Sequence, residues 1–374
     1  MTSSPSFKKH EEITPPRGTF PGANQIVALF KEIKSGYVSE SQPWKKFQLK
    51  QPEEYGEIER LLLADTDDSL WGFVDDKIRY DFDADRNQVV VRMPTPLHER
   101  FVVYVRDDYK DQFRFFASST TLEESVARFA QYLLDMGSTD ISFPPRTDSD
   151  SLQKSKNSPD ISFKHKLAKW PGVIIEVSYS TKRKDLPKLA DRYILGSTGS
   201  VQAVVGIDIE YQHPNQTQVK SREAVFSVWQ PEYVQNNEGD LELVAAQKIK
   251  DQPFRDAQGN PVSSPDLSLP LSSFGTPNLS QAMIDHDQLI NISTNKLCEY
   301  LHEAEEQMRM LSTDLLDEIS LLPGAKVRYR EATPPEVLSE EDEEKFCRLE
   351  KEASQKRDDE DPDWEGETES TTCD

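Results

Sequence analysis

The sequence predicts an α/β protein with a central mixed sheet flanked by helices and with peripheral helices towards both ends. Two observations support this class, and a third separates a tail from the folded part. A strand–helix–strand pattern over residues 173–209 needs a crossover, which implies a parallel pair of strands. Clear helix starts alternate with short runs rich in Val and Ile. Residues 336–369 hold 16 acidic and 5 basic residues, which predicts an acidic disordered tail outside the folded part.

Composition limits the possible classes of protein. The chain has 374 residues, enough for one large domain or two ordinary ones. Only 36% of the residues are hydrophobic and 30% are charged, so we expect part of the chain to be disordered. No apolar stretch approaches the length of a membrane span, and the N-terminus lacks a signal-peptide core. These features predict an intracellular protein, cytoplasmic or nuclear, with no membrane association.

The first half of the chain shows helix and strand patterns in a clear order. Thr95 followed by Pro96 is a good helix start, with a hydroxyl N-cap and a proline at the first position. Thr121 and Glu124 match a capping box for a second helix, which Gly137 would end. Further predicted elements are helices over 24–33 and 53–64 and a hairpin of strands over 77–82 and 88–93.

The second half contains the predicted core of the sheet. Thr139–Phe143 and Pro159–Phe163 share an Asp-Ile-Ser-Phe sequence, which predicts two similar strands facing each other across a surface loop at 145–158. Strands over 173–178, 201–211 and 224–229 follow, with an amphipathic helix from about Asp185 between the first two. Residues 231–276 are rich in Pro and Ser and predict only short extended pieces. A long helix over 288–321 would pack on the core or bind a partner or a second copy.

These patterns divide the chain into four regions. Residues 1–22 are disordered, 23–230 form the α/β domain with a helical N-terminal extension, 231–330 form a connection ending in the long helix, and 331–374 form the acidic tail. Cys298, Cys347 and Cys373 are isolated, which favours reduced thiols over a zinc site.

Two carboxylates stand out as site candidates. Glu176 lies inside the apolar run Pro171–Ser178, and Asp160 follows Pro159 at the start of another extended segment. Burying an ionised carboxylate costs several kcal/mol unless a cation or hydrogen-bond donors meet it. Two such carboxylates on neighbouring strands would form a site for a hard divalent cation, Mg²⁺ or Mn²⁺. Asp140 is the alternative to Asp160.

The order of these residues resembles the PD-(D/E)XK nuclease superfamily, in the bacterial putative restriction endonuclease branch and in a version found in fungal proteins. The resemblance covers roughly residues 70–230, from Arg92–Glu99 through Pro159-Asp160 and Glu176 to Lys184–Tyr193. It implies a restriction-endonuclease-like core in which Asp160 and Glu176 bind the metal. The chain departs from the motif at Ser178, where the family has a lysine.

The resemblance implies a Mg²⁺-dependent phosphodiesterase acting on DNA or RNA. Lys188, or else Lys184, would replace the missing lysine at the phosphate, and Glu99 would complete the site. A solvated basic helix face is the alternative reading of both lysines. The net charge of −23 opposes nucleic-acid binding, although the cluster Lys182–Lys184 with Lys188 and Arg192 is locally basic. The alternative function is a catalytically inactive member of the fold that binds a protein partner.

Overall fold

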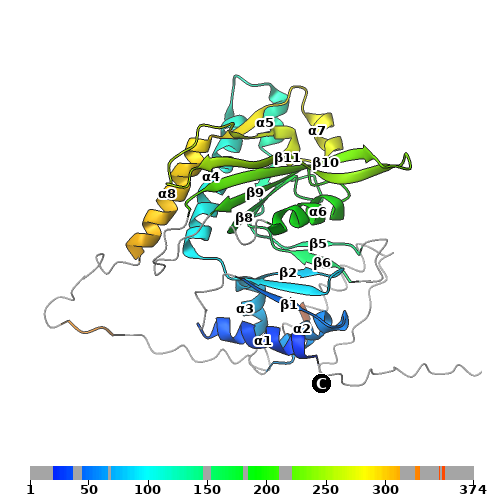
Figure 1. Ribbon diagram of the computed structural model, residues 1–374, viewed down its shortest axis with the longest axis vertical. Coiled ribbons are helices and arrows are strands. Elements are labelled where there is room, and N and C mark those ends of the chain that lie inside the picture. Colours follow the sequence, from blue (N-terminus) through cyan, green and yellow to red (C-terminus); the bar gives the residue numbers. More distant parts are fainter. Residues whose placement is uncertain are drawn as a thin grey trace, which may run out of the picture. The chain divides into compact units, whose positions relative to one another are not determined.

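The computed structural model in Figure 1 describes residues 20–36, 44–65, 69–145, 153–179, 184–209 and 221–311, with short pieces at 325–328, 345 and 348–349. The chain divides into two units, Met1–Leu316 and Asp317–Asp374, and every element named below belongs to the first. Disorder was predicted for residues 1–22, of which 1–19 lie outside the described residues, as does most of the acidic tail. The prediction is wrong at its last residues, because Pro21 and Gly22 form the first turn of a helix, Pro21–Lys34. None of the described helices is both long and apolar enough to cross a membrane.

Two sheets and a small hairpin make up the β-structure. The strand orders are β1-β3-β2-β6-β5, β11-β10-β9-β8-β7-β4 and β12-β13. Among the described strand pairs, β8 and β9 are parallel and the other pairs are antiparallel, so the larger sheet is mixed, as predicted. The strands are β1 Trp44–Gln48, β2 Arg79–Asp83, β3 Gln88–Arg92, β4 Leu133–Asp135, β5 Ile141–Phe143, β6 Ser155–Asn157, β7 Ile161–His165, β8 Val173–Tyr179, β9 Ala203–Ile209, β10 Ala224–Gln235, β11 Leu241–Arg255, β12 Leu267–Pro270 and β13 Leu289–Ile292.

Helices cover the sheets in layers (Figure 1). Helices α1 to α3 cover one face of the smaller sheet, and α6 lies between the two sheets. The opposite face of the larger sheet carries α4, α5 and α8. The helices are α1 Pro21–Lys34, α2 Glu53–Leu63, α3 Ser69–Lys77, α4 Pro96–Ser118, α5 Glu124–Ala130, α6 Leu186–Gly196, α7 Pro277–Met283 and α8 Thr294–Leu311, with a short 3₁₀ turn at Leu271–Phe274.

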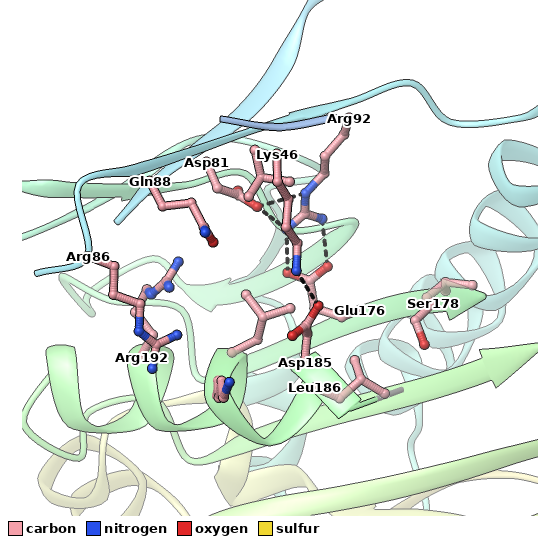
Figure 2. A pocket seen from close by; sticks show the side chains of 14 residues that line it. Lys46, Asp81, Arg86, Gln88, Arg92, Glu176, Ser178, Asp185, Leu186 and Arg192 are labelled. Carbon is pink, nitrogen blue, oxygen red and sulfur yellow. Dashed lines mark hydrogen bonds and ion pairs between the residues drawn. The ribbon is translucent and has the colours of Figure 1, made fainter. Parts of the chain in front are cut away.

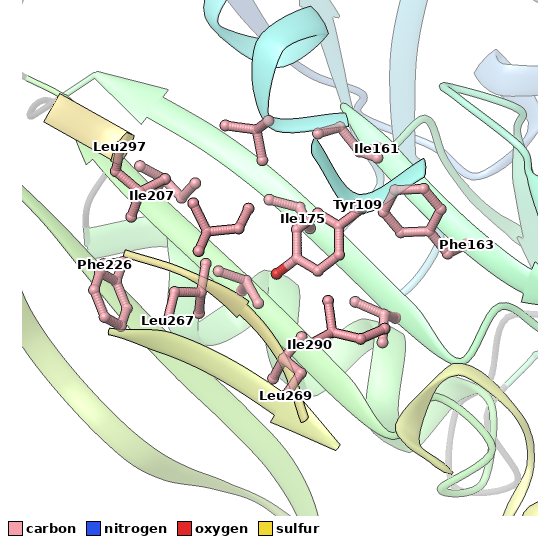
Figure 3. Packing of buried hydrophobic residues seen from close by; sticks show 14 of the residues in the cluster. Tyr109, Ile161, Phe163, Ile175, Ile207, Phe226, Leu267, Leu269, Ile290 and Leu297 are labelled. Atoms are coloured by element: carbon pink, nitrogen blue, oxygen red, sulfur yellow. The ribbon is translucent and has the colours of Figure 1, made fainter. Parts of the chain in front are cut away.

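The main core lies between the larger sheet and its helices. Figure 3 shows Tyr109 of α4 among Ile175, Phe163 and other side chains of the sheet. Side chains alternate across a strand, so Val173, Ile175 and Val177 of β8 enter this core. Ile174 points the other way, into a smaller cluster with α6. The same alternation turns Glu176 away from the main core and towards α6 and the smaller sheet.

Several predicted boundaries agree with the structure. Thr95 caps α4, and its Oγ1 accepts a hydrogen bond from the backbone N–H of His98 at 3.3 Å. The predicted hairpin is β2–β3, and the strand–helix–strand crossover is β8–α6–β9. The β1 strand and the α3 helix were not predicted, because their short, charged sequences carry little periodic signal.

The predicted second helix and the predicted strand pair are wrong in detail. Helix α5 ends at Ala130 rather than near Gly137, because the chain turns into β4. Thr121 does not cap it, and its hydroxyl lies 3.1 Å from that of Ser119 instead. Strands β5 and β7 do not face each other, since they belong to different sheets. Strand β5 pairs with β6, which lies inside the segment predicted as a surface loop.

The region after residue 230 contributes more to the fold than predicted. Strand β10 runs through that position, and β11 pairs with it as one strand of 15 residues rather than as short pieces. Register shifts interrupt the pairing of this strand, and many of its side chains are partly exposed. Its sequence therefore lacks the regular alternation of apolar and polar residues that predicts a strand. Helix α8 begins at Thr294, after β13, and its Leu297, Leu301 and Ala304 are buried in the main core. The described part of the predicted 288–321 helix therefore packs on the core.

We predict that Gly172→Ala destabilises the fold. A Cβ at Gly172 would lie 2.4 Å from backbone atoms of Ser273 and Phe274, which cannot move aside as a side-chain end could. Overpacking of this kind costs about 1–3 kcal/mol, measured as the free energy of unfolding in urea.

Gly56→Ala is the matched control. Gly56 lies in α2, and nothing stands within 4 Å of its added Cβ. This variant is expected to be neutral or to gain up to about 1 kcal/mol from helix propensity. Equal stability of the Gly172 variant and the wild type would contradict the close packing of the 3₁₀ turn.

Candidate functional site

Glu176 is buried at 2% exposure on the face of β8 that points towards α6. Its carboxylate forms a two-pronged contact with the guanidinium of Arg92, at 2.8 Å from Nη1 to Oε2 and 3.3 Å from Nη2 to Oε1 (Figure 2). The hydroxyl of Tyr193, from α6, donates to Oε1 at 2.5 Å. Both carboxylate oxygens of Glu176 are thus engaged by donors.

Asp160 is buried at 4% exposure just before β7. Its Oδ2 accepts from the backbone N–H of Val177 at 2.8 Å and lies 3.2 Å from Nε2 of His98. Its Oδ1 lies 3.4 Å from Arg79 and 3.7 Å from Nη1 of Arg92. Asp160 and Glu176, predicted to lie together, both come within 4 Å of the same nitrogen of Arg92.

Arg92 comes from β3 of the smaller sheet and is held there by Asp81 of the paired strand β2. Its Nε and Nη2 donate to Oδ2 of Asp81 at 2.9 and 2.7 Å. The backbone N–H of Ser158 donates to the other oxygen of Asp81 at 2.9 Å. Hereafter the Arg92 network means Arg92 with Asp81, Asp160, Glu176 and Tyr193.

Burial and charge shift several pKa values in opposite directions. Burial, reinforced by the charges of Asp160 and Asp81, raises the pKa of Glu176 to about 7, although Arg92 acts against this rise. Burial also acts to raise the pKa of Asp160, but His98, Arg92 and the Val177 N–H hold that pKa well below its ordinary value. Burial acts to lower the pKa of Arg92, and its three carboxylate partners raise it well above the ordinary value instead. The guanidinium is therefore permanently charged.

Glu99 and His98 lie beside this network at the start of α4. Glu99 is half-exposed and lies 3.3 Å from Arg79 and 3.5 Å from Nδ1 of His98. Burial acts to raise the pKa of Glu99, but His98 and Arg79 lower it overall. Burial acts to lower the pKa of His98, yet Asp160 and Glu99 raise it to about 9. Helix α4 thus adds a positive charge next to Asp160 as well as a negative one.

The two candidate lysines, Lys188 in α6 and Lys184 just before it, lie outside the Arg92 network. Lys188 is exposed and lines a cavity of about 70 Å³ that Glu176 and Arg92 also line. Lys184 is exposed and does not line that cavity. Neither lysine has an ion pair with Asp160 or Glu176 among the described residues. Lys182 and Arg183 of the predicted basic cluster lie outside the described residues.

Asp140, the alternative to Asp160, is placed elsewhere. Its Oδ2 lies 2.5 Å from Nζ of Lys156, and its Oδ1 accepts from the hydroxyl of Ser158. Both partners come from β6 or the residue after it, in the smaller sheet. Asp140 therefore belongs to a separate ion pair.

Arg92 and Asp81 belong to the site although the sequence did not predict them there. A signal existed in the hairpin, where Tyr80 and Phe82 alternate with Asp81 and Asp83. Tyr80 and Phe82 are buried against α1 to α3, so the two aspartates must face the opposite side, towards the larger sheet. A polar face on a hairpin is usually solvent-facing, and only the packing of α6 and β8 against it makes this face a site.

The carboxylate oxygens of Asp160 and Glu176 are not arranged to bind a divalent cation. Mg²⁺ requires oxygen ligands at about 2.0–2.1 Å, with bound water completing an octahedron. Here all four oxygens of Asp160 and Glu176 face cationic or N–H and O–H donors instead. No group of three or more His, Cys, Asp and Glu side chains within the described ranges is arranged to hold a metal.

Comparisons with protein-family models and with curated proteins find no match to this chain. The assignment of a function therefore depends on the residues and their geometry.

We predict a pH-dependent loss of stability for His98→Gln. The pKa of His98 in the folded protein, about 9, lies above the value of about 6.5 for an unfolded histidine. Its charge therefore stabilises the fold fully below about pH 6.5, and this contribution disappears as pH rises through 9. The loss in the free energy of unfolding should be on the order of 2 kcal/mol at pH 6 and small at pH 10.

His302→Gln is the control, because His302 lies on the exposed side of α8. Surface substitutions change stability by about 0.5 kcal/mol or less. A His98 variant whose loss of stability is the same at pH 6 and pH 10 would show that His98 acts by packing rather than by charge.

Proposed function

We propose that this chain is a restriction-endonuclease-like protein that binds a phosphate group of nucleic acid without metal-dependent cleavage. The observation that carries the proposal is the guanidinium of Arg92 between Asp160 and Glu176. A phosphodiesterase of this superfamily would use these carboxylates for metal. In this chain a side chain already meets their charge.

The cavity beside Glu176 supports phosphate binding. More cationic than anionic side chains line this cavity. The cationic ones come from the β1–β3 side and from α6, and they are Lys46, Arg86, Arg92, Lys188 and Arg192. The anionic ones are Asp81, Glu176 and Asp185. Its volume of about 70 Å³ exceeds the space of a single water and suits a small polar group. Exposed charges are screened beyond about 8–10 Å, so this local excess outweighs the distant acidic residues.

The cations of this cavity differ in how far they are already paired. Lys46 lies 2.6 Å from Asp185, and Arg192 contacts Asp83. Arg86 lies 3.8 Å from Asp83 and is half-exposed. Lys188 has no ion pair among the described residues and is exposed. Arg86 and Lys188 are therefore the side chains best able to contact an incoming phosphate.

The second candidate function is the metal-dependent phosphodiesterase that the sequence resemblance implies, with Mg²⁺ or Mn²⁺ as cofactor. One observation favours it: Asp160 and Glu176 converge on a single cationic nitrogen, as two ligands of one ion would. This function requires Arg92 to leave the carboxylates. Cleavage of DNA or RNA in Mg²⁺ or Mn²⁺ that disappears in Glu176→Gln would establish it and overturn the binding-only proposal.

We predict that the wild type binds short single- or double-stranded DNA or RNA in EDTA, measured by fluorescence anisotropy across a salt series. Removing a side chain that neutralises one phosphate lowers the slope of log K against log salt by about one. The double variant Arg86→Ala/Lys188→Ala should therefore bind about 10-fold or more weakly at low salt, with a shallower salt dependence.

Lys248→Ala is the control, because Lys248 is also partly exposed but pairs with Glu232 on the β10–β11 hairpin. Its affinity should equal that of the wild type. Equal weakening in both variants would indicate a general charge effect rather than a site. No binding of any nucleic acid by the wild type would favour the protein-binding alternative.

A further inference from the structure

Arg92 has the surroundings of a bound cation rather than of a surface arginine. Its side chain is 10% exposed, and its three carboxylate partners are between 3% and 6% exposed. The partners come from three places in the fold: Asp81 from β2, Asp160 from the residue just before β7, and Glu176 from β8. A single cation thus joins strands of two sheets.

We propose that Arg92 is a tethered substitute for a divalent cation, and that removing its side chain turns Asp81, Asp160 and Glu176 into a binding site for Mn²⁺ or Mg²⁺ that the wild type lacks. The chemistry of the ligands supports this. Carboxylate oxygens are the ligands that hard divalent cations prefer, and Mg²⁺ usually keeps several waters. The cavity of about 70 Å³ next to Arg92 gives water access to the space that the guanidinium would leave.

The balance of charges around Arg92 also supports a divalent cation as its replacement. Four carboxylates, those of Asp81, Glu99, Asp160 and Glu176, face the guanidiniums of Arg92 and Arg79 and the imidazole of His98. Removing Arg92 leaves the buried carboxylates of Asp81 and Glu176 without this ion-pair partner, which is strongly unfavourable. A divalent cation would restore that charge, whereas a second cation beside the intact Arg92 would have to displace the guanidinium.

The geometry explains why the wild type should exclude a metal. Arg92 donates through Nε, Nη1 and Nη2, and each of these nitrogens has a carboxylate oxygen within 2.9 Å. The planar guanidinium matches carboxylates in pairs, and its pKa is too high for it to lose its charge. A free ion must therefore compete with a cation whose effective concentration is fixed by the chain.

The test is Mn²⁺ binding to purified wild type, Arg92→Ala and Arg92→Met, measured by calorimetry and by thermal unfolding. We expect no stoichiometric Mn²⁺ site in the wild type. Arg92→Ala should unfold at lower temperature, bind one Mn²⁺ at least about 10-fold more tightly than the wild type, and regain thermal stability in Mn²⁺. Adding Glu176→Gln to Arg92→Ala should abolish that site.

Arg86→Ala is the matched control, since Arg86 lines the same cavity but lies apart from the three carboxylates. It should gain no Mn²⁺ site. Low millimolar guanidinium should also stabilise Arg92→Ala and not Arg86→Ala, because the free ion fits the vacated position.

Two results would overturn the inference. The first is a wild-type Mn²⁺ site that Glu176→Gln removes, since Arg92 would then yield to the metal. The second is folded Arg92→Ala or Arg92→Met with no gain in Mn²⁺ affinity. If both variants unfold, failure to refold in Mn²⁺ counts against the inference and recovery of the folded signal supports it. These readouts involve no nucleic acid, so they stand apart from the proposed function.

Discussion

The contacts of Arg92 are the interaction on which the arrangement of the two sheets depends. The smaller sheet packs its apolar residues against α1 to α3, and the larger sheet packs its own against α4, α5 and α8. Between them, β3 reaches β8 through the pair of Arg92 with Glu176. Each buried charge would cost several kcal/mol without its partner, so the sheets must approach in the one register that pairs them.

The elements around this contact are placed by ordinary packing rules. The alternation of β8 sends Ile175 into the main core and Glu176 to the opposite face. The hairpin alternation sends Phe82 to the helices and Asp81 towards Glu176. Helix α6 contributes Ala190 and Ile194 to a small apolar cluster and Tyr193 to the carboxylate. The site thus arises where polar faces of three well-packed elements meet.

This construction connects stability with function. In a metal-dependent centre, the carboxylates are left short of counter-charge so that an ion can bind. Here Arg92 supplies that charge from within the chain. Cationic side chains outnumber anionic ones around the neighbouring cavity, and among them Arg86 and Lys188 are the least engaged by carboxylates. These two properties are the basis of the proposed phosphate binding.

Local sequence was enough to predict the start of α4, the β2–β3 hairpin, the parallel crossover and the two buried carboxylates. Thr95, Pro96 and the Val/Ile runs act through neighbours within a few residues, so their effects can be read locally. Tertiary structure alone decided which cation meets those carboxylates, since Arg92 and Glu176 lie 84 residues apart. Tertiary structure also decided the length of β11, because its partly polar sequence does not mark where pairing with β10 ends. It decided the packing of α8 as well, because an amphipathic stripe fits a partner and a core equally well.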